Sequence, residues 1–255
     1  MTPPPPWCCR RARHALAAAV AILSGCASPG ASVRSELADT AAAPPLQSPP
    51  SEPSPLEAVL AGARTTLGRS NPELDGQRVP TDCSGYLRAL YARAGLDLFS
   101  EGRVSDNGVR AIVRFVEHRG GLYRRGLPVA GDLVFFDNSY DRNGDGRLND
   151  RFTHAGLVER VLPDGTALIV HATNHGIVRE PMNLLHPHDL TDVDGHPINA
   201  FLRRKVAGEP PRAPRLMSEL YAGFGRVIGR APTASAQLQR RGHGPSGRAA
   251  RRTAR

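Results

Sequence analysis

The sequence predicts an α+β domain, in which helices from its first half pack on an antiparallel β-sheet from its second half. Between residues 54 and 118, apolar residues recur three times at the spacing of a helix. From residue 131 onward they come instead in short runs rich in β-branched and aromatic residues, which is typical of strands. The turn "PDG" (163–165) separates two of these runs and makes them antiparallel neighbours.

The first 55 residues indicate export and a tether. Three arginines precede the apolar run Ala15–Leu23, which is too short to span a bilayer and is typical of a signal peptide. The run ends in "LSGC", which resembles a bacterial lipobox, in which the cysteine, here Cys26, is acylated. An ordinary signal peptide cut near Ala27 is the alternative. We therefore expect a lipoprotein signal peptide over 1–25, lipidation at Cys26, and a Pro-, Ser- and Ala-rich tether over 26–55.

The first helix begins where the tether ends. Ser54 is a suitable N-cap, Pro55 suits the first helical position, and Glu57 completes a capping box. This pattern predicts a helix over "PLEAVLAGARTTLG" and places the start of the folded domain, 56–206, at this point.

Two further helices are expected before the sheet. One begins at Thr81 or Asp82 and runs to about Ala94, because Gly95 is a typical helix end. Asp106 can cap the other. The apolar face of that helix comprises Val109, Ile112, Val113 and Val116.

The expected strands follow in order. They are "GDLVFF" (131–136), "THAGLVERV" (153–161), "TALIVHAT" (166–173) and a final strand "INAFLRR" (198–204). We expect residues 207–255 to form a basic, largely disordered tail, since they are rich in Pro, Gly and Arg. Within that tail, apolar residues recur at helical spacing between 216 and 228, although glycines weaken that helix.

The net charge of +9 is concentrated at the ends of the chain. The leader contributes +3 and residues 207–255 contribute +8, which leaves about −2 for residues 26–206. The domain itself therefore carries no basic signature of nucleic-acid binding, and we expect no nucleic-acid partner. The tail is suited to contact with an anionic polymer, and a merely solvated tail is the alternative.

One cysteine is a candidate nucleophile. Of the four cysteines, three lie in the first 26 residues, so Cys83 is the one thiol expected in the folded domain. It lies at the start of a predicted helix, where the N-terminal dipole lowers the pKa of a thiol. A buried, inert cysteine is the alternative.

Two histidines favour the catalytic interpretation. His154 begins one predicted strand and His171 ends the next, so the hairpin should bring them together at one end of the sheet. A nearby imidazole can activate a thiol, and a third group can orient that imidazole. His175 and Asn174 are alternatives for the third position.

Four blocks, "DCSGYLRALYARAG", "PVAGDLVFF", "THAGLVERV" and "ALIVHATNHGI", resemble in content and order the NlpC-type cell-wall cysteine peptidases. The resemblance implies a papain-like core over roughly residues 56–180. It also implies that Cys83 is the nucleophile, His154 the general base and His171 the residue that orients the base. Asp82 and Ser84 would shape the site, and the backbone N–H of Cys83 would contribute to an oxyanion hole.

The resemblance implies hydrolysis of peptidoglycan stem peptides at D-glutamyl–diamino-acid bonds, with no cofactor required for the chemistry. CHAP-type amidases share the cysteine–histidine pair, so an N-acetylmuramoyl-L-alanine amidase is an alternative. A non-catalytic lipoprotein that binds wall or calcium on the same scaffold is a second. We expect a location in the bacterial cell envelope, with acylated Cys26 as the membrane anchor. No aspartate follows Cys26, so in a cell with two membranes the pattern resembles that of lipoproteins sorted to the periplasmic face of the outer membrane. The oligomeric state is not predicted.

The loop "DNSYDRNGDGRLNDRF" (137–152) is a candidate calcium site. Its oxygen-bearing residues alternate and are followed by Gly146, as in the first half of an EF-hand loop. Phe152 stands where that pattern has a bidentate glutamate. An insertion that simply makes turns is the alternative. The candidate ligands are Asp141, Asn143, Asp145, Asn149 and Asp150.

Overall fold

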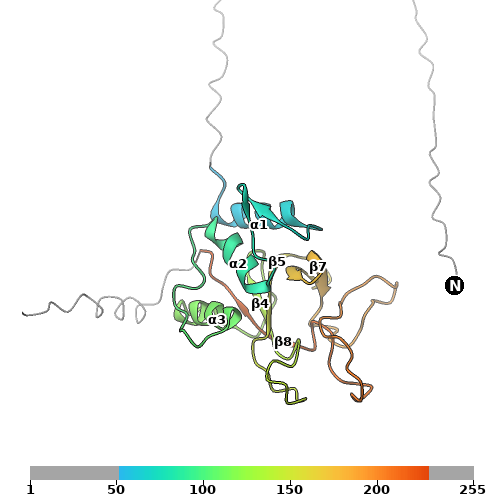
Figure 1. The fold of residues 1–255 in the computed structure, drawn as a ribbon. Coiled ribbons are helices and arrows are strands. Elements are labelled where there is room, and N and C mark those ends of the chain that lie inside the picture. Colours follow the sequence, from blue (N-terminus) through green and yellow to red (C-terminus); the bar gives the residue numbers. More distant parts are fainter. Residues whose placement is uncertain (1–51, 230–255) are drawn as a thin grey trace, which may run out of the picture. The chain divides into compact units, whose positions relative to one another are not determined.

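A computed structural model describes residues 52–229 of the chain (Figure 1). The predicted signal peptide, Cys26, most of the tether and the tail from residue 230 lie outside the described residues. Within the described part, no helix is long and apolar enough to cross a membrane. The elements are α1 (Pro55–Thr66), β1 (Glu73–Leu74), β2 (Gln77–Arg78), α2 (Cys83–Ala92), α3 (Gly108–His118), β3 (Leu122–Tyr123), β4 (Leu133–Phe136), β5 (His154–Val161), β6 (Ala167–Thr173), β7 (Gly176–Met182) and β8 (Tyr221–Gly225).

The first helix begins as predicted. The Ser54 hydroxyl accepts a hydrogen bond from the Glu57 backbone N–H, and the Glu57 carboxylate accepts one from the Ser54 N–H. This capping box satisfies donors that the first helical turn leaves without intrahelical partners. Helix α1 starts at Pro55, one residue inside the segment assigned to the tether.

The next two helices also lie where they were expected, with one different cap. Asp82, one of the two predicted starts, is the N-cap of α2, and the helix itself begins at Cys83. Helix α3 is capped by Asn107, whose side chain accepts from the Arg110 backbone N–H, so the expected cap at Asp106 is wrong. Asp106 instead accepts from the Arg103 N–H and the Arg114 guanidinium, which fixes the turn before the helix. The predicted apolar face of α3 is buried.

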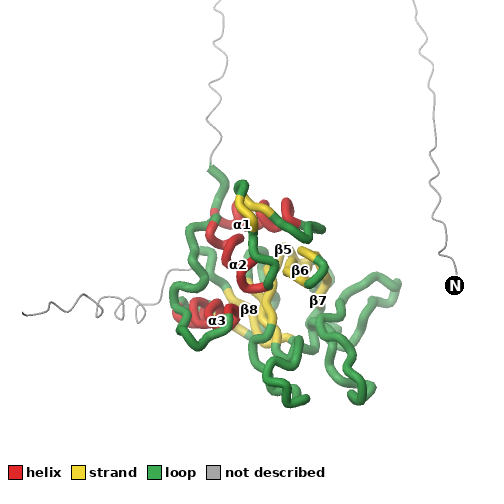
Figure 2. The backbone as a smooth tube through the Cα atoms, in the orientation of Figure 1, coloured by secondary structure: helices red, strands yellow, loops and turns green. Residues whose placement is uncertain are grey.

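Six strands form one antiparallel sheet in the order β3-β8-β4-β5-β6-β7. The predicted hairpin is β5–β6, and the predicted α+β class is confirmed. A separate two-residue hairpin, β1–β2, precedes α2. The connection from β7 to β8 is mostly loop (Figure 2).

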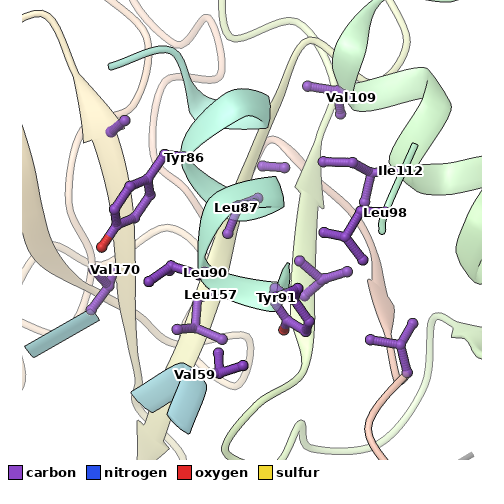
Figure 3. Close-up of a cluster of buried hydrophobic side chains, with 14 of the residues drawn as sticks. Val59, Tyr86, Leu87, Leu90, Tyr91, Leu98, Val109, Ile112, Leu157 and Val170 are labelled. Atoms are coloured by element: carbon purple, nitrogen blue, oxygen red, sulfur yellow. The ribbon is translucent and has the colours of Figure 1, made fainter. Parts of the chain in front are cut away.

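The sheet separates two hydrophobic cores. In β4, Leu133 and Phe135 face the larger core, whereas Val134 and Phe136 face the smaller one, which explains why all four residues of this strand are buried. Helix α2 fills the larger core with four fully buried side chains (Figure 3): Tyr86, Leu87, Leu90 and Tyr91. The hydroxyl groups of both tyrosines are hydrogen-bonded, so their burial leaves no unpaired phenol in this core.

Strand β8 corrects the prediction for the C-terminal segment. Residues 221–225 lie between β3 and β4 inside the sheet, so the domain does not end at residue 206 and the helical interpretation of 216–228 is wrong. Glycines explain the difference. A Cβ on Gly225 would lie 2.9 Å from Val116 and 3.0 Å from Phe135, so this strand can pass beneath α3 only without a side chain here.

Two other strand predictions differ from the structure. Residues 198–204 form no strand and make only an isolated bridge between Phe201 and Leu216, so the expected final strand is wrong. The sheet edge is instead formed by β7, which contains Pro181. An edge strand tolerates proline because one side of its backbone needs no ladder partner.

Candidate active site

The N-terminus of α2 is built around the Asp82 carboxylate. One carboxylate oxygen accepts hydrogen bonds from the Ser84 hydroxyl at 2.6 Å and from the Gly85 backbone N–H at 2.9 Å. Burial alone would raise the pKa of Asp82, but these hydrogen bonds lower it below its usual value. The two residues expected to shape the site, Asp82 and Ser84, are thus hydrogen-bonded to each other.

Two glycines allow this turn to pack tightly. A Cβ on Gly85 would lie 2.6 Å from the Asp82 carboxylate and 2.6 Å from Pro80. A Cβ on Gly108 would lie 2.1 Å from the Ser84 hydroxyl oxygen. Gly108 at the start of α3 thus packs closely against Ser84, the residue that follows Cys83. This contact helps to fix the N-terminus of α2.

The sheet brings three titratable side chains to one face. The register of β6 and β7 pairs His171 with Val178 and Ile169 with Glu180, so His171 and Glu180 are diagonal neighbours on the same face. On β5, His154 and Gly156 share a face, and a Cβ on Gly156 would lie 3.3 Å from that of His171. The predicted approach of His154 and His171 is confirmed.

These three side chains form a continuous hydrogen-bonded chain. His154 Nε2 lies 2.9 Å from His171 Nδ1, and His171 Nε2 lies 2.9 Å from Glu180 Oε2. The two imidazole rings are nearly perpendicular, at 85°. The His171 side chain is only 1% exposed, so its orientation is fixed by the surrounding packing and by these two hydrogen bonds.

With Glu180 ionised and His171 neutral, the hydrogen-bonded chain determines which nitrogen of each ring carries a proton. An ionised carboxylate only accepts hydrogen bonds, so His171 Nε2 donates to Glu180. Nδ1 of a neutral His171 is then an acceptor, and His154 Nε2 must donate to it. This leaves His154 Nδ1 without a proton, and it is the nitrogen that can act as a base.

Cys83 contacts the start of β5, the strand that carries His154. The β4–β5 pairing continues to His154, whereas the β5–β6 pairing begins at Leu157 and Val170. The first residues of β5 are therefore paired on one side, and the Ala155 N–H forms a hydrogen bond with the Cys83 sulfur. This contact places the thiol beside the residue that follows His154.

The ionisation of Cys83 differs from the expectation. Burial, with a smaller contribution from the nearby Asp82 charge, raises the pKa of the thiol to about 11. Hydrogen bonds from the Ala155, Ser84 and Cys83 N–H groups act in the opposite direction but are weaker. The expected lowering of the pKa by the helix N-terminus is therefore wrong for this resting site, because desolvation of the thiolate dominates.

Burial also keeps His154 neutral. Burial, together with the smaller effect of the charge that His171 can carry, lowers the pKa of His154 to about 3. A thiol that ionises near pH 11 and an imidazole that protonates near pH 3 are both neutral over a wide pH range. The resting pair is a thiol and an imidazole, and not a preformed ion pair.

Cys83, His154, His171 and Glu180 line one cleft of about 1040 Å³. Asp82 and Ser84 line it as well. The alternative third residues, Asn174 and His175, are exposed in the turn between β6 and β7 and also line the cleft, but His171 is the residue that bonds His154.

Glu180 was not among the predicted site residues. Glu180 lies on β7, and the neighbouring Pro181 argues against a strand when the sequence is considered alone. No strand was therefore predicted for residues 176–182, in which Val178 and Glu180 share a face. The short turn between Thr173 and Gly176 fixes the register of this hairpin, and it is the sequence signal that relates Glu180 to His171.

The candidate calcium loop has its oxygen atoms largely engaged within the loop. The Asp141 carboxylate accepts from the Gly144 and Gly146 N–H groups, and Asp145 accepts from the Arg147 N–H and the Asn149 amide. The Asn143 amide oxygen accepts from the Asp145 N–H, and the buried Asp150 carboxylate accepts from the Arg142 N–H.

Phe152 is buried against Phe135 at the end of this loop, which accounts for a hydrophobic residue where an EF-hand has glutamate. Within residues 52–229, Asp192, Asp194 and His196 form a group whose possible metal-ligand atoms lie within 4.8 Å of one another. The His, Cys, Asp and Glu side chains of the 137–152 loop form no such group. Calcium binding by this loop stays a prediction.

In comparisons with known proteins, the chain matches no protein-family model, no curated protein and no solved structure.

Proposed function

We propose that this protein is a cysteine hydrolase that cleaves amide bonds in the stem peptides of peptidoglycan. The observation that carries the proposal is the hydrogen-bonded chain from Glu180 through His171 to His154, in one cleft with Cys83 at a helix N-terminus. A nucleophile, a base and a group that orients the base are the parts that covalent amide hydrolysis needs.

The proposed reaction begins from the neutral pair. As the Cys83 sulfur attacks the carbonyl carbon, its proton passes to His154 Nδ1. A carbon–sulfur bond forms, and the developing oxyanion is stabilised by N–H groups at the start of α2, including that of Cys83. The imidazolium then gives its proton to the leaving amine as the carbon–nitrogen bond breaks. Water, deprotonated by His154, hydrolyses the thioester and restores the thiol.

His171 and Glu180 act through His154 in this scheme. The two hydrogen bonds keep the proton of neutral His154 on Nε2 and leave Nδ1 free to accept the thiol proton. When His154 becomes positively charged, its Nε2–H bond to His171 strengthens, and the Glu180 carboxylate at the end of the chain stabilises that charge. His171 and Glu180 are therefore positioning residues.

The substrate assignment rests on the resemblance of four sequence blocks to the NlpC-type peptidases. It favours D-glutamyl–diamino-acid bonds, and the cleft volume of about 1040 Å³ is large enough to hold a segment of a peptide. The proposed location is the bacterial envelope, with a lipid anchor at Cys26. Labelling cells with a palmitate analogue tests the anchor, because a Cys26→Ser variant should lose the label.

Digestion of purified sacculi tests the reaction. The protein should release fragments whose masses correspond to cleavage after D-glutamate, and Cys83→Ala should release none. Removal of a catalytic nucleophile typically costs several orders of magnitude in rate, whereas His175→Ala, a matched change in the same cleft, should keep most of the activity. Release of complete stem peptides beginning with L-alanine would instead identify an amidase. Binding to sacculi without any product would identify a non-catalytic wall-binding protein.

A further inference from the structure

One wall of the cleft is basic. Arg203, Arg204 and Lys205 belong to the segment that follows Phe201, and Arg215 lies across the Phe201–Leu216 bridge. All four basic residues line the cleft that contains Cys83. None of them belongs to the catalytic chain of hydrogen bonds.

Arg203 has a donor that is left without a partner. Its side chain is 9% exposed and forms an ion pair with Glu209 through Nη2. Its Nη1 is buried and makes no hydrogen bond with any described residue. Buried guanidinium nitrogens are normally hydrogen-bonded, because an unpaired one loses its hydration without compensation. Arg203 therefore contributes positive charge to this wall, together with a buried donor for which the described residues supply no acceptor.

The neighbouring cations are also available to a ligand. Arg204 and Lys205 are exposed and form no ion pair with any residue in the 52–229 range. The Arg215 guanidinium carbon lies over the Phe201 ring, 4.7 Å from the ring centroid, and the Arg215 charge also acts on Glu209. A planar guanidinium suits recognition of a carboxylate.

The acidic groups of the cleft do not neutralise this wall. Asp82 is bonded to Ser84 and to the Gly85 N–H, and Glu180 is bonded to His171. Asp141 is bonded to backbone N–H groups of its own loop. The cleft thus has fixed acceptors beside Cys83 and, at Arg204 and Lys205, two exposed cations that form no ion pair with any residue in the 52–229 range.

We propose that Arg203, Arg204, Lys205 and Arg215 form a subsite that binds a free carboxylate of the substrate beside the bond that is cleaved. This inference rests on the proposed function and specifies its substrate class. An amide bond formed through a side-chain carboxyl leaves the α-carboxylate of the same residue free. The basic wall therefore selects peptides with a free carboxylate over the same peptides with a carboxamide.

A matched pair of synthetic peptides tests the subsite. The two peptides contain the same D-glutamyl–diamino-acid bond and differ in one group, a free α-carboxylate or the corresponding carboxamide on the D-glutamyl residue. The kcat/KM ratio of acid to amide is measured for the natural protein and for an Arg204→Gln/Lys205→Gln variant. These two side chains are exposed, so their replacement should not disturb folding. The control is Arg78→Gln/Arg125→Gln, which removes the same charge from exposed positions outside the cleft lining.

The natural protein and the control should prefer the acid by about tenfold or more, the size expected for one charged hydrogen bond. In the Arg204→Gln/Lys205→Gln variant this ratio should fall several-fold, and added salt should reduce it in the natural protein. Equal rates for acid and amide in the natural protein, or an unchanged ratio in the variant, would overturn the subsite.

Binding to Cys83→Ala separates this inference from the proposed reaction. Calorimetry with the same two peptides needs no turnover. If neither peptide is hydrolysed by the natural protein but the acid binds Cys83→Ala more tightly than the amide, the subsite stands and the hydrolase proposal falls. If both peptides are hydrolysed equally well and bind equally well, the hydrolase proposal stands and the subsite falls.

Discussion

Replacing Glu180 with alanine removes the acceptor at the end of the hydrogen-bonded chain. His171 Nε2, in a side chain that is 1% exposed, loses its 2.9 Å partner. His171 can then carry its proton on Nδ1 instead, which turns His154 Nε2 into an acceptor and moves the His154 proton to Nδ1. That nitrogen can no longer take the thiol proton, so the variant tests whether the chain sets the protonation of the base.

The expected magnitude follows from the geometry. An unpaired buried donor costs about 1–3 kcal/mol. Because the Glu180 side chain is 32% exposed, water can reach the gap, and we expect a value near the low end, about 1 kcal/mol. A domain of this size should then lose about 2–4 °C in Tm. Loss of one charge-assisted contact to the transition state should lower kcat by about tenfold to hundredfold.

Steady-state hydrolysis of a stem peptide distinguishes a positioning role from a structural one. Glu180→Ala should lower kcat with little change in KM, because the lost contact acts on charge that develops during the reaction. Glu180→Gln should be milder, since its amide oxygen still accepts from His171. Glu73→Ala, an exposed change on β1, is the control. If Glu180→Ala keeps its kcat within about twofold while Tm falls as expected, the tautomer argument is refuted.

Three further predictions concern the same domain. Because burial raises the pKa of Cys83 to about 11, iodoacetamide should modify this thiol slowly at pH 7 and steadily faster towards pH 11; a rate that levels off below pH 8 would contradict the neutral resting thiol. Burial lowers the pKa of His154 from its usual 6.5 to about 3, so between these values the unfolded chain binds more protons than the folded protein. The stability that neutral His154 contributes is therefore lost as pH falls through this window, and a His154→Gln variant should show a flatter dependence of Tm on pH there. Calcium should raise both Tm and turnover if loop 137–152 binds it, with a midpoint in the range of about micromolar to millimolar; identical values in chelator, together with a silent Asp145→Ala, would exclude this role for the loop.

The sequence predicted those structural features that depend on contacts between residues close together in the chain. The capping box at Ser54 and the helix start near Asp82 depend on contacts over three or four residues, and both are present in the structure. The meeting of His154 and His171 followed from one turn and the direction of two strands. In each case the deciding contacts lie within a helix turn or a hairpin, where spacing alone fixes the geometry.

The features that sequence reasoning missed depend on distant contacts. The apolar residues around β8 recur at the spacing of a helix. The glycines of β8 allow close contact with residues about 90–110 positions earlier in the chain, which the local sequence does not reveal. The pKa of Cys83 depends on how much of the domain covers the thiol, which a helix position does not reveal. Glu180 lies on an edge strand, and the neighbouring Pro181 argued against a strand at this place in the sequence.

The position of β8 also determines when the domain can fold. Leu122 of β3 and Leu133 of β4 both pair with Gly225 of β8. Both partners are therefore synthesised about 90–100 residues before the strand with which they pair. Until residue 225 is available, β3 lacks its neighbour and β4 exposes an unpaired edge beside the strand that carries His154. Closing such a long loop is slow. A chain stopped before β8 should therefore remain an incomplete sheet that is prone to aggregate, and the proposed hydrolytic site should form only after residue 225 has been synthesised.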